Sequence, residues 1–294
     1  MKGAARAILE GLIDYAGLFP PAGLPMREAV LSYAAYQRRP DAWALGRFVV
    51  PVSRLGEFEA SIGELSERDL LGARWPLTAL LGPEVRADLG RVEAFNERYL
   101  HGGPDVLSLE ARAGNPGEIA SLRALVPSRY ELYLELPLAG SLAPLMEALA
   151  ASRARAKMRT GGTQVAEIPA TEAVLEFLVL AARLRVPFKA TAGLHHPLRG
   201  IAALTYQPGS ARATMFGYLN VFLAATVLWS GGSADDAGRL LAIEDRSQLQ
   251  LGENAIRWGA VEVARAEIVR TRREFALALG SCSFTEPLEE IETL

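Results

Sequence analysis

Short apolar runs alternate along the chain with longer segments in which apolar residues recur at helical spacing. The runs expected to form strands cover 12–19, 46–52, 75–82, 105–113, 130–138, 154–162 and 186–196, with a weaker one at 239–245. The segments expected to form helices cover 26–39, 54–70, 84–100, 117–125, 141–152, 170–184, 214–229 and 256–278. Strands that alternate with helices are typical of parallel β-α units. The pattern therefore predicts an α/β fold, a (β/α)8 TIM-type barrel with a C-terminal helical extension, and an open doubly wound α/β sheet is the alternative.

One domain accounts for the whole length. The chain has 294 residues, which suits one barrel of about 250 residues with additions. No segment rich in Pro, Gly or Ser divides it, so we expect a single barrel domain over 1–294. The sequence contains neither the GxGxxG pattern of a dinucleotide-binding fold nor a P-loop. The last residues, 280–294, are expected to pack across the surface or to cap one end.

Four consecutive central strands carry polar side chains on one face, although a parallel barrel is usually apolar on both faces. Because side chains alternate along a strand, these polar faces consist of Ser108, Glu110 and Arg112, of Glu131, Tyr133 and Glu135, of Lys157 and Arg159, and of Lys189 and Thr191. Burying an unpaired charge costs several kcal/mol, so such groups pair or line a solvated site. If the polar faces point inward, they converge near the carboxyl ends of the strands, where barrel active sites lie. A structural ion-pair network inside the barrel is the alternative.

Charge and composition narrow the partners. The net charge of −3 and the pI near 5.8 do not resemble a basic nucleic-acid footprint. The longest apolar stretch, 216–232, is short and flanked by glycine, which predicts a buried helix and not a membrane span. The amino terminus carries acidic residues, unlike a signal peptide. We therefore expect a cytoplasmic protein that acts on a small molecule, without nucleic-acid or membrane partners, as a monomer or a homo-oligomer.

Lysine is scarce, since Lys2, Lys157 and Lys189 are the only lysines. Lys189 lies inside a predicted strand between apolar residues. Burial and nearby cations both lower the pKa of an amine, and Lys157 and Arg159 on the preceding strand are the expected cations. The nearest carboxylate is expected to pair with an arginine, whose fork fits it better. These considerations predict a lowered pKa for Lys189, which could then attack a carbonyl and form a Schiff base, with Lys157 as the second catalytic lysine.

The segment FKATAGLHHP, 188–197, adds polar groups directly after the same strand. His195 and His196 are neighbours, so their side chains point in different directions and are not expected to bind one metal. We expect His195 to act as a general acid or base, and Thr191 and His196 to contact the substrate. Histidines satisfied by structural hydrogen bonds in a loop are the alternative.

The heptapeptide PFKATAG, 187–193, resembles the lysine strand of Schiff-base (β/α)8 aldolases, notably deoxyribose-phosphate aldolase. In that family the imine-forming lysine lies on strand six and another lysine lies nearby. The resemblance implies a lyase with an imine-forming strand lysine. Lys189 falls on strand seven if 12–19 is strand one, and on strand six if 12–19 is a lid or capping segment.

The segment AKMRTGG, 156–162, ends a predicted strand with an arginine and a pair of glycines. Backbone amides in glycine turns bind anions, and a guanidinium group strengthens such a site. Arg159, Gly161 and Gly162 are therefore candidate ligands for a carboxylate or phosphate of the substrate, with Glu110 as a further substrate contact. A plain strand-to-loop turn is the alternative.

Carboxylates offer a second kind of chemistry. Asp14 follows an early apolar run and is a candidate acid, base or metal ligand, and Glu135 is a candidate catalytic carboxylate. We expect no cofactor, but Asp14, Glu110 and Glu135 could instead hold a divalent metal. The single cysteine, Cys282, excludes an internal disulfide and has no evident partner nearby in sequence, so it is interpreted as a small buried residue.

Three functions remain open from the sequence. The favoured one is a barrel enzyme of the lyase or aldolase type that acts on a small anionic carbonyl or sugar-like substrate through a strand-end lysine. A metal-assisted lyase, isomerase or hydrolase that uses strand-end carboxylates is the second. A non-catalytic ligand-binding or scaffold protein is the third, and Glu110, Lys157 and Lys189 tightly paired in a dry barrel would favour it.

Overall fold

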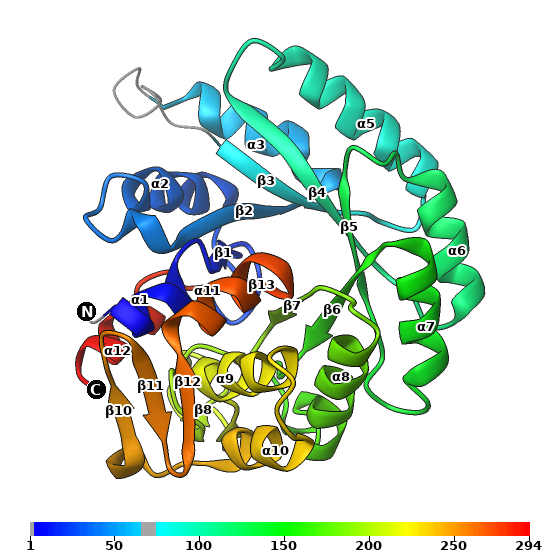
Figure 1. Cartoon of the computed structure of the whole chain (residues 1–294). Coiled ribbons are helices and arrows are strands. Elements are labelled where there is room, and N and C mark those ends of the chain that lie inside the picture. Colours follow the sequence, from blue (N-terminus) through cyan, green and yellow to red (C-terminus); the bar gives the residue numbers. More distant parts are fainter. Residues whose placement is uncertain (1–2, 66–74) are drawn as a thin grey trace.

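A computed structural model describes residues 3–65 and 75–294, which include a closed barrel of eight parallel strands (Figure 1). The barrel strands are β1 (Ile13–Tyr15), β2 (Leu45–Pro51), β3 (Trp75–Leu80), β4 (Pro104–Arg112), β5 (Glu131–Glu135), β6 (Arg155–Arg159), β7 (Phe188–Thr191) and β13 (Ala276–Ser281). Each strand pairs with the next in this order, and β13 pairs with β1 to close the barrel. The predicted (β/α)8 fold is confirmed, and the alternative of an open sheet is wrong. Lys157 lies on the sixth barrel strand and Lys189 on the seventh.

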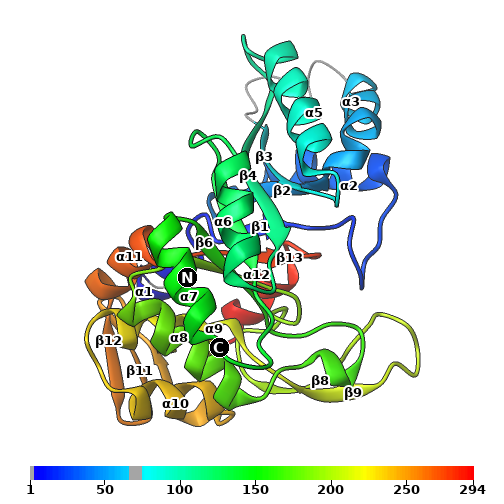
Figure 2. The ribbon, with the colours of Figure 1, turned by 90° about the vertical axis from the view of Figure 1, so that its right-hand side faces the viewer.

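Helices connect the strands and cover the outside of the barrel, as Figures 1 and 2 show. They are α1 (Gly3–Leu9), α2 (Met26–Tyr36), α3 (Leu55–Gly63), α5 (Val85–Arg98), α6 (Pro116–Leu125), α7 (Ala143–Ser152), α8 (Thr171–Arg183), α9 (Tyr218–Trp229), α10 (Ala234–Ala242), α11 (Arg265–Glu274) and α12 (Glu286–Glu292). Helix α3 ends at Gly63, before the end of the helix expected over 54–70, and residues 66–70 of that range lie outside the described part of the chain. The C-terminal end of the chain is helical, in α12 after the last barrel strand, although the sequence predicted the C-terminal helix over 256–278.

The predicted strand at 239–245 is wrong, because Ala234–Ala242 forms helix α10. Ser233 caps this helix by accepting a hydrogen bond from the backbone N–H of Asp236. Ala237, Leu240 and Leu241 are buried on one face. The apolar pair that suggested a strand therefore belongs to the core face of an amphipathic helix.

The eighth strand lies where the sequence predicted the end of a long helix, over 256–278. Residues 249–264 form instead a small antiparallel sheet of β10 (Leu249–Leu251), β11 (Ala255–Trp258) and β12 (Val261–Ala264). Gly259 has a positive φ of 60° and allows the tight turn between β11 and β12. Only Arg265–Glu274 remains helical, and β13 begins directly after it.

A long insertion separates β7 from β13. It contains the hairpin of β8 (Gly200–Ala203) and β9 (Arg212–Met215), which projects beside the barrel (Figure 2). The predicted buried helix is confirmed as α9, in which Asn220 is buried and donates hydrogen bonds to the carbonyls of Leu240 and Ile243. No helix in the described residues has the length and apolar character needed to cross a membrane.

Candidate active site

The carboxyl ends of the barrel strands surround one cavity of about 1160 Å³. Six side chains that the sequence predicted to converge line this cavity: Glu110, Glu135, Lys157, Arg159, Lys189 and His195. The polar strand faces therefore point inward, as predicted, and meet at the mouth of the barrel. Whether these side chains are catalytic stays a prediction.

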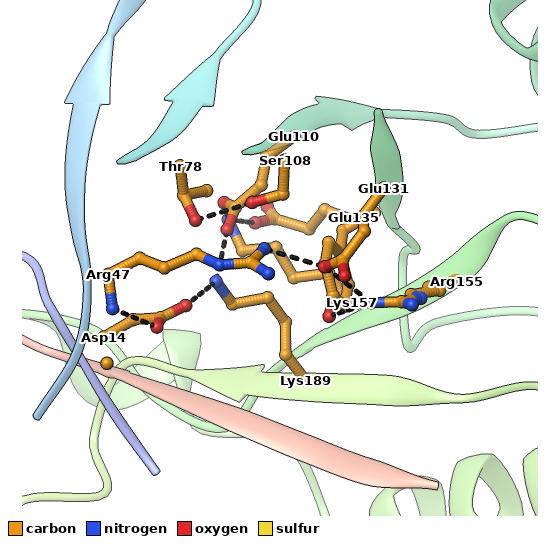
Figure 3. A network of polar contacts seen from close by, with 12 residues as sticks. Asp14, Arg47, Thr78, Ser108, Glu110, Glu131, Glu135, Arg155, Lys157 and Lys189 are labelled. Atoms are coloured by element: carbon orange, nitrogen blue, oxygen red, sulfur yellow. Dashed lines mark hydrogen bonds and ion pairs between the residues drawn. The ribbon is translucent and has the colours of Figure 1, made fainter. Parts of the chain in front are cut away.

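At the base of the cavity, positive and negative side chains alternate in a continuous chain (Figure 3). Lys189 Nζ lies 2.6 Å from Asp14 Oδ2 and 2.6 Å from Glu110 Oε1. Glu110 Oε2 lies 2.7 Å from Lys157 Nζ, which in turn lies 3.0 Å from Glu135 Oε2. Each lysine thus lies between two carboxylates. The alternation compensates charges that would be costly to bury alone.

The ends of this chain of charges are held differently. At the buried end, Asp14 Oδ1 accepts a hydrogen bond of 2.8 Å from the backbone N–H of Arg47. A Cβ atom on Gly46 would lie 2.5 Å from the same oxygen, so the absence of a side chain at Gly46 leaves room for Asp14. At the open end, Glu135 Oε1 lies 3.3 Å from the Nε of Arg112, whose side chain is exposed. The chain of charges therefore runs from the barrel interior towards solvent.

The electrostatics of the buried end contradict the expectation for Lys189. Burial works against the ammonium form, but Asp14 and Glu110 outweigh it and raise the pKa of Lys189 above its usual value. Burial likewise works against the charged carboxylate of Glu110, but Lys157 and Lys189 outweigh it and lower the pKa of Glu110 to about 2. The predicted lowering of the Lys189 pKa is wrong, because two carboxylates and not two cations face its amine. The expectation that the nearest carboxylate pairs with an arginine is also wrong for Glu110.

A second ionic layer lies below the first and closes the floor of the barrel. Glu131 Oε2 lies 2.7 Å from Arg47 Nη1 and 2.6 Å from Arg155 Nη1. Arg155 also donates a hydrogen bond of 2.8 Å to the hydroxyl of Tyr133, and the ring of Tyr133 lies under Lys189 Nζ at 5.3 Å. These contacts support the lysine layer from beneath.

Arg159 lies on the cavity wall one inward position beyond Lys157. Among the described residues it has no ion-pair or hydrogen-bond partner in the structure, and it lines the cavity. The prediction that the backbone amides of Gly161 and Gly162 bind a substrate anion has less support. Glu167 already accepts hydrogen bonds from the backbone N–H groups of Thr163 and Gln164, directly after Gly162. The protein's own carboxylate therefore occupies the anion-binding part of this turn, and Arg159 remains as the cation available to a ligand.

Gly161 has a packing role. A Cβ atom on Gly161 would lie 3.0 Å from the Cα of Gly193, which has a φ of 78°. Thr160 Oγ1 donates a hydrogen bond of 2.6 Å to the carbonyl of Ala192 beside this contact. The glycines thus let the ends of β6 and β7 approach closely. Thr191 lines the cavity next to them.

The neighbouring histidines point in different directions, as predicted, and only one faces the cavity. His195 is among the lining residues, and its Nδ1 lies 3.3 Å from Glu286 Oε2. His196 Nδ1 lies 2.7 Å from Glu290 Oε1 on α12, and the side chain is not among the described lining residues. The expectation that His196 contacts the substrate is therefore not supported by its position.

The carboxylates considered for a metal are engaged by lysines. Both oxygens of Glu110 face ammonium groups, and Asp14 and Glu135 each face one. Within the described residues, no group of three or more His, Cys, Asp or Glu side chains is arranged to hold a metal ion. A divalent metal at these carboxylates stays a prediction that elemental analysis would test.

Apolar residues form another part of the cavity wall. This apolar wall consists of Phe19, Pro20 and Pro21 after β1, Leu80 and Leu81 at the end of β3, Val85 at the start of α5, and Leu122 and Leu125 on α6. A cavity with one charged wall and one apolar wall suits a ligand with a polar end and a hydrocarbon part. This wall could not be predicted from the sequence, because most of its residues lie in loops and on helices outside the barrel strands.

The chain was compared with protein-family models, with curated proteins and with solved structures, and no match was found. The resemblance of 187–193 to Schiff-base aldolases therefore rests on those residues alone.

Proposed function

We propose that this protein is a lyase of the aldolase type, which forms an imine between a strand lysine and a small anionic carbonyl compound. The observation that carries the proposal is the alternating chain of charges at the base of the open cavity, in which Lys157 and Lys189 share Glu110. A lysine in a cavity can act as a nucleophile, and neighbouring carboxylates can carry protons to and from it.

The proposed nucleophile is Lys157 and not Lys189. Lys189 is only 1% exposed and is held by two carboxylates at 2.6 Å, so its amine keeps its proton. Lys157 is 8% exposed, and its second carboxylate, Glu135, is the more distant one at 3.0 Å. The resemblance of 187–193 implied an imine at Lys189, but Lys189 lies on strand seven, whereas Lys157 lies on strand six, the strand that carries the imine-forming lysine in those aldolases.

The neighbouring side chains supply the proton transfers. Glu135 takes a proton from the ammonium group of Lys157, and the free amine attacks the carbonyl carbon. The resulting carbinolamine loses its hydroxyl as water when Glu135 returns the proton, which leaves a protonated imine. The protonated imine then withdraws electrons from the adjacent carbon, so that a C–H or C–C bond next to it breaks. Lys189 remains charged and compensates Glu110 throughout.

Arg159 is the proposed ligand for the anionic group of the substrate. It lies at the same wall as Lys157, two residues further along β6, and has no partner among the described residues. A guanidinium binds a carboxylate or a phosphate through two parallel hydrogen bonds. The remaining part of the substrate lies along the apolar wall.

A scaffold role is the competing proposal, because Glu110, Lys157 and Lys189 are tightly paired. The scaffold interpretation required a dry barrel, however, and these three residues line a cavity large enough for a small-molecule ligand. The openness of the site favours the enzymatic proposal.

Exchange of α-protons in D2O tests the proposal whatever the final product of the reaction is. An imine acidifies the carbon next to it, so pyruvate, hydroxyacetone and short aldehydes should lose their α-proton signals by NMR in the presence of the protein. Lys157→Arg keeps the positive charge between Glu110 and Glu135 but cannot form an imine, and should slow the exchange about 100-fold or more. Equal exchange by Lys157→Arg and the wild type would refute the proposal.

A further inference from the structure

A second group of reactive side chains includes two residues that line the cavity. It consists of Cys282 directly after β13, His195 after β7, Tyr206 in the loop of the β8–β9 hairpin and Glu286 at the start of α12. Cys282 and His195 line the cavity. Cys282 was interpreted from the sequence as an inert buried residue because its partners are distant in the chain.

The contacts follow the order of a nucleophile, a base and an orienting carboxylate. Cys282 Sγ lies 4.0 Å from His195 Nε2. The other ring nitrogen, Nδ1, lies 3.3 Å from Glu286 Oε2, at an angle that falls short of a hydrogen bond. Such contacts are often long in the free protein and shorten when a ligand binds. We propose that Cys282, His195 and Glu286 form a nucleophilic triad that accepts the acyl group of an ester or thioester bound in the cavity.

The surroundings of the imidazole suit this role. Burial disfavours the charged ring, but the contacts with Cys282 and Glu286 outweigh it and raise the pKa of His195 to about 9. A ring with this pKa holds a proton at neutral pH, which a general acid for the leaving group requires.

A tyrosine hydroxyl also contacts the sulfur. Tyr206 Oη lies 3.6 Å from Cys282 Sγ and donates a hydrogen bond of 2.9 Å to Glu286. The orienting carboxylate is thus held in place by a group that also contacts the nucleophile.

The reaction step balances without a further reactant. With the thiol proton held on His195, Cys282 Sγ attacks the acyl carbon and a carbon–sulfur bond forms. The bond to the leaving oxygen or sulfur breaks, and His195 gives its proton to that leaving group. The acyl group then remains on Cys282 until water removes it with His195 as the base. This chemistry uses no lysine and does not depend on the proposed imine.

Acetylation by p-nitrophenyl acetate near neutral pH tests the triad, because Cys282 is the only thiol in the chain. We expect a burst of one equivalent of p-nitrophenolate per chain, with the acetyl group on the peptide that contains Cys282. His195→Gln should slow the burst about 100-fold, as expected for loss of a general acid–base group. Glu286→Gln, at a partly exposed position, should slow it about tenfold, as expected for loss of the orienting charge at about 1.4 kcal/mol.

His196→Gln is the matched control, since this neighbouring histidine pairs with Glu290 away from the cavity. It should leave the burst unchanged, and circular dichroism melting should show that all variants remain folded. Cys282→Ser should abolish the burst, and this outcome does not depend on whether Lys157 forms the imine. Acetylation of lysine in place of Cys282, or equal bursts in the Glu286→Gln, His195→Gln and His196→Gln variants, would overturn the triad.

Discussion

Lys157 and Lys189 are register partners on neighbouring barrel strands and share one carboxylate between them. The two oxygens of Glu110 lie 2.7 Å from one ammonium nitrogen and 2.6 Å from the other. This sharing couples the lysines, because any change in the charge of one alters the compensation available to the other. It also distinguishes them, since Lys189 has Asp14 in the interior and Lys157 has Glu135 towards the cavity mouth.

Removal of the shared charge is the first test of this arrangement. Glu110→Gln leaves two buried ammonium groups without the carboxylate between them, and we expect a loss of about 3–5 kcal/mol in the free energy of unfolding. Urea denaturation measures it. The matched control is Glu59→Gln, which breaks the more exposed pair with Arg98 at 2.7 Å and should cost at most about 1 kcal/mol. Equal losses in the two variants would show that the Glu110 pairs contribute no more than a surface pair.

Acid should destabilise the fold through the same residue. The pKa of Glu110 is about 2 in the folded protein, against 4.5 for an unperturbed glutamate. A lowered pKa gives stability that is fully present above the unfolded value and is lost as the pH falls from about 4.5 towards 2. The loss over that window should approach about 3 kcal/mol, since one pKa unit corresponds to about 1.4 kcal/mol.

Urea denaturation at several pH values between 5 and 2 measures this slope. In Glu110→Gln the acid-dependent loss should be smaller by about the same 3 kcal/mol. Parallel pH profiles for the variant and the wild type would contradict the lowered pKa.

The barrel and the convergence of its polar strand faces could both be predicted from the sequence. Alternation in 105–113 and 130–138 placed Glu110 and Glu135 on the inward face independently of the topology. The eighth strand could not be predicted, because the small apolar residues of 276–281 directly follow a helical pattern and extend its periodicity. Both outcomes have one cause. The local sequence pattern indicates which face of a strand or helix a side chain occupies more reliably than where that strand or helix ends.

The charges around Lys189 could not be predicted without knowledge of how the barrel closes. Strand β13 lies between β1 and β7, and this closure brings Asp14 to a lysine 175 positions away in the sequence. Without that contact the nearest expected charges were cations on β6, which gave the wrong direction for the pKa. The proposed triad could not be predicted from the sequence for the same reason, since Cys282 and His195 are 87 positions apart.

Arg159 should set the preference for anionic ligands. Arg159→Gln removes from the cavity a guanidinium that has no partner in the described part of the chain. We expect binding of pyruvate or inorganic phosphate to weaken about 10- to 100-fold, as for loss of a charged hydrogen-bonding pair worth about 1.5–3 kcal/mol. Isothermal titration calorimetry measures the change. Arg54→Gln, at an arginine already paired with Glu57, should leave binding unchanged. Unchanged affinity in Arg159→Gln would place the anion site elsewhere.

The central claim is that Lys157 is the amine that forms the imine, and reductive trapping tests it most directly. The protein is incubated with pyruvate, hydroxyacetone or a short aldehyde and treated with sodium borohydride, and the modified lysine is located by peptide mass spectrometry. We predict one adduct per chain, on Lys157, which is absent in Lys157→Arg and persists in Cys282→Ser. An adduct on Lys189, or no adduct with any of these compounds, would contradict the account.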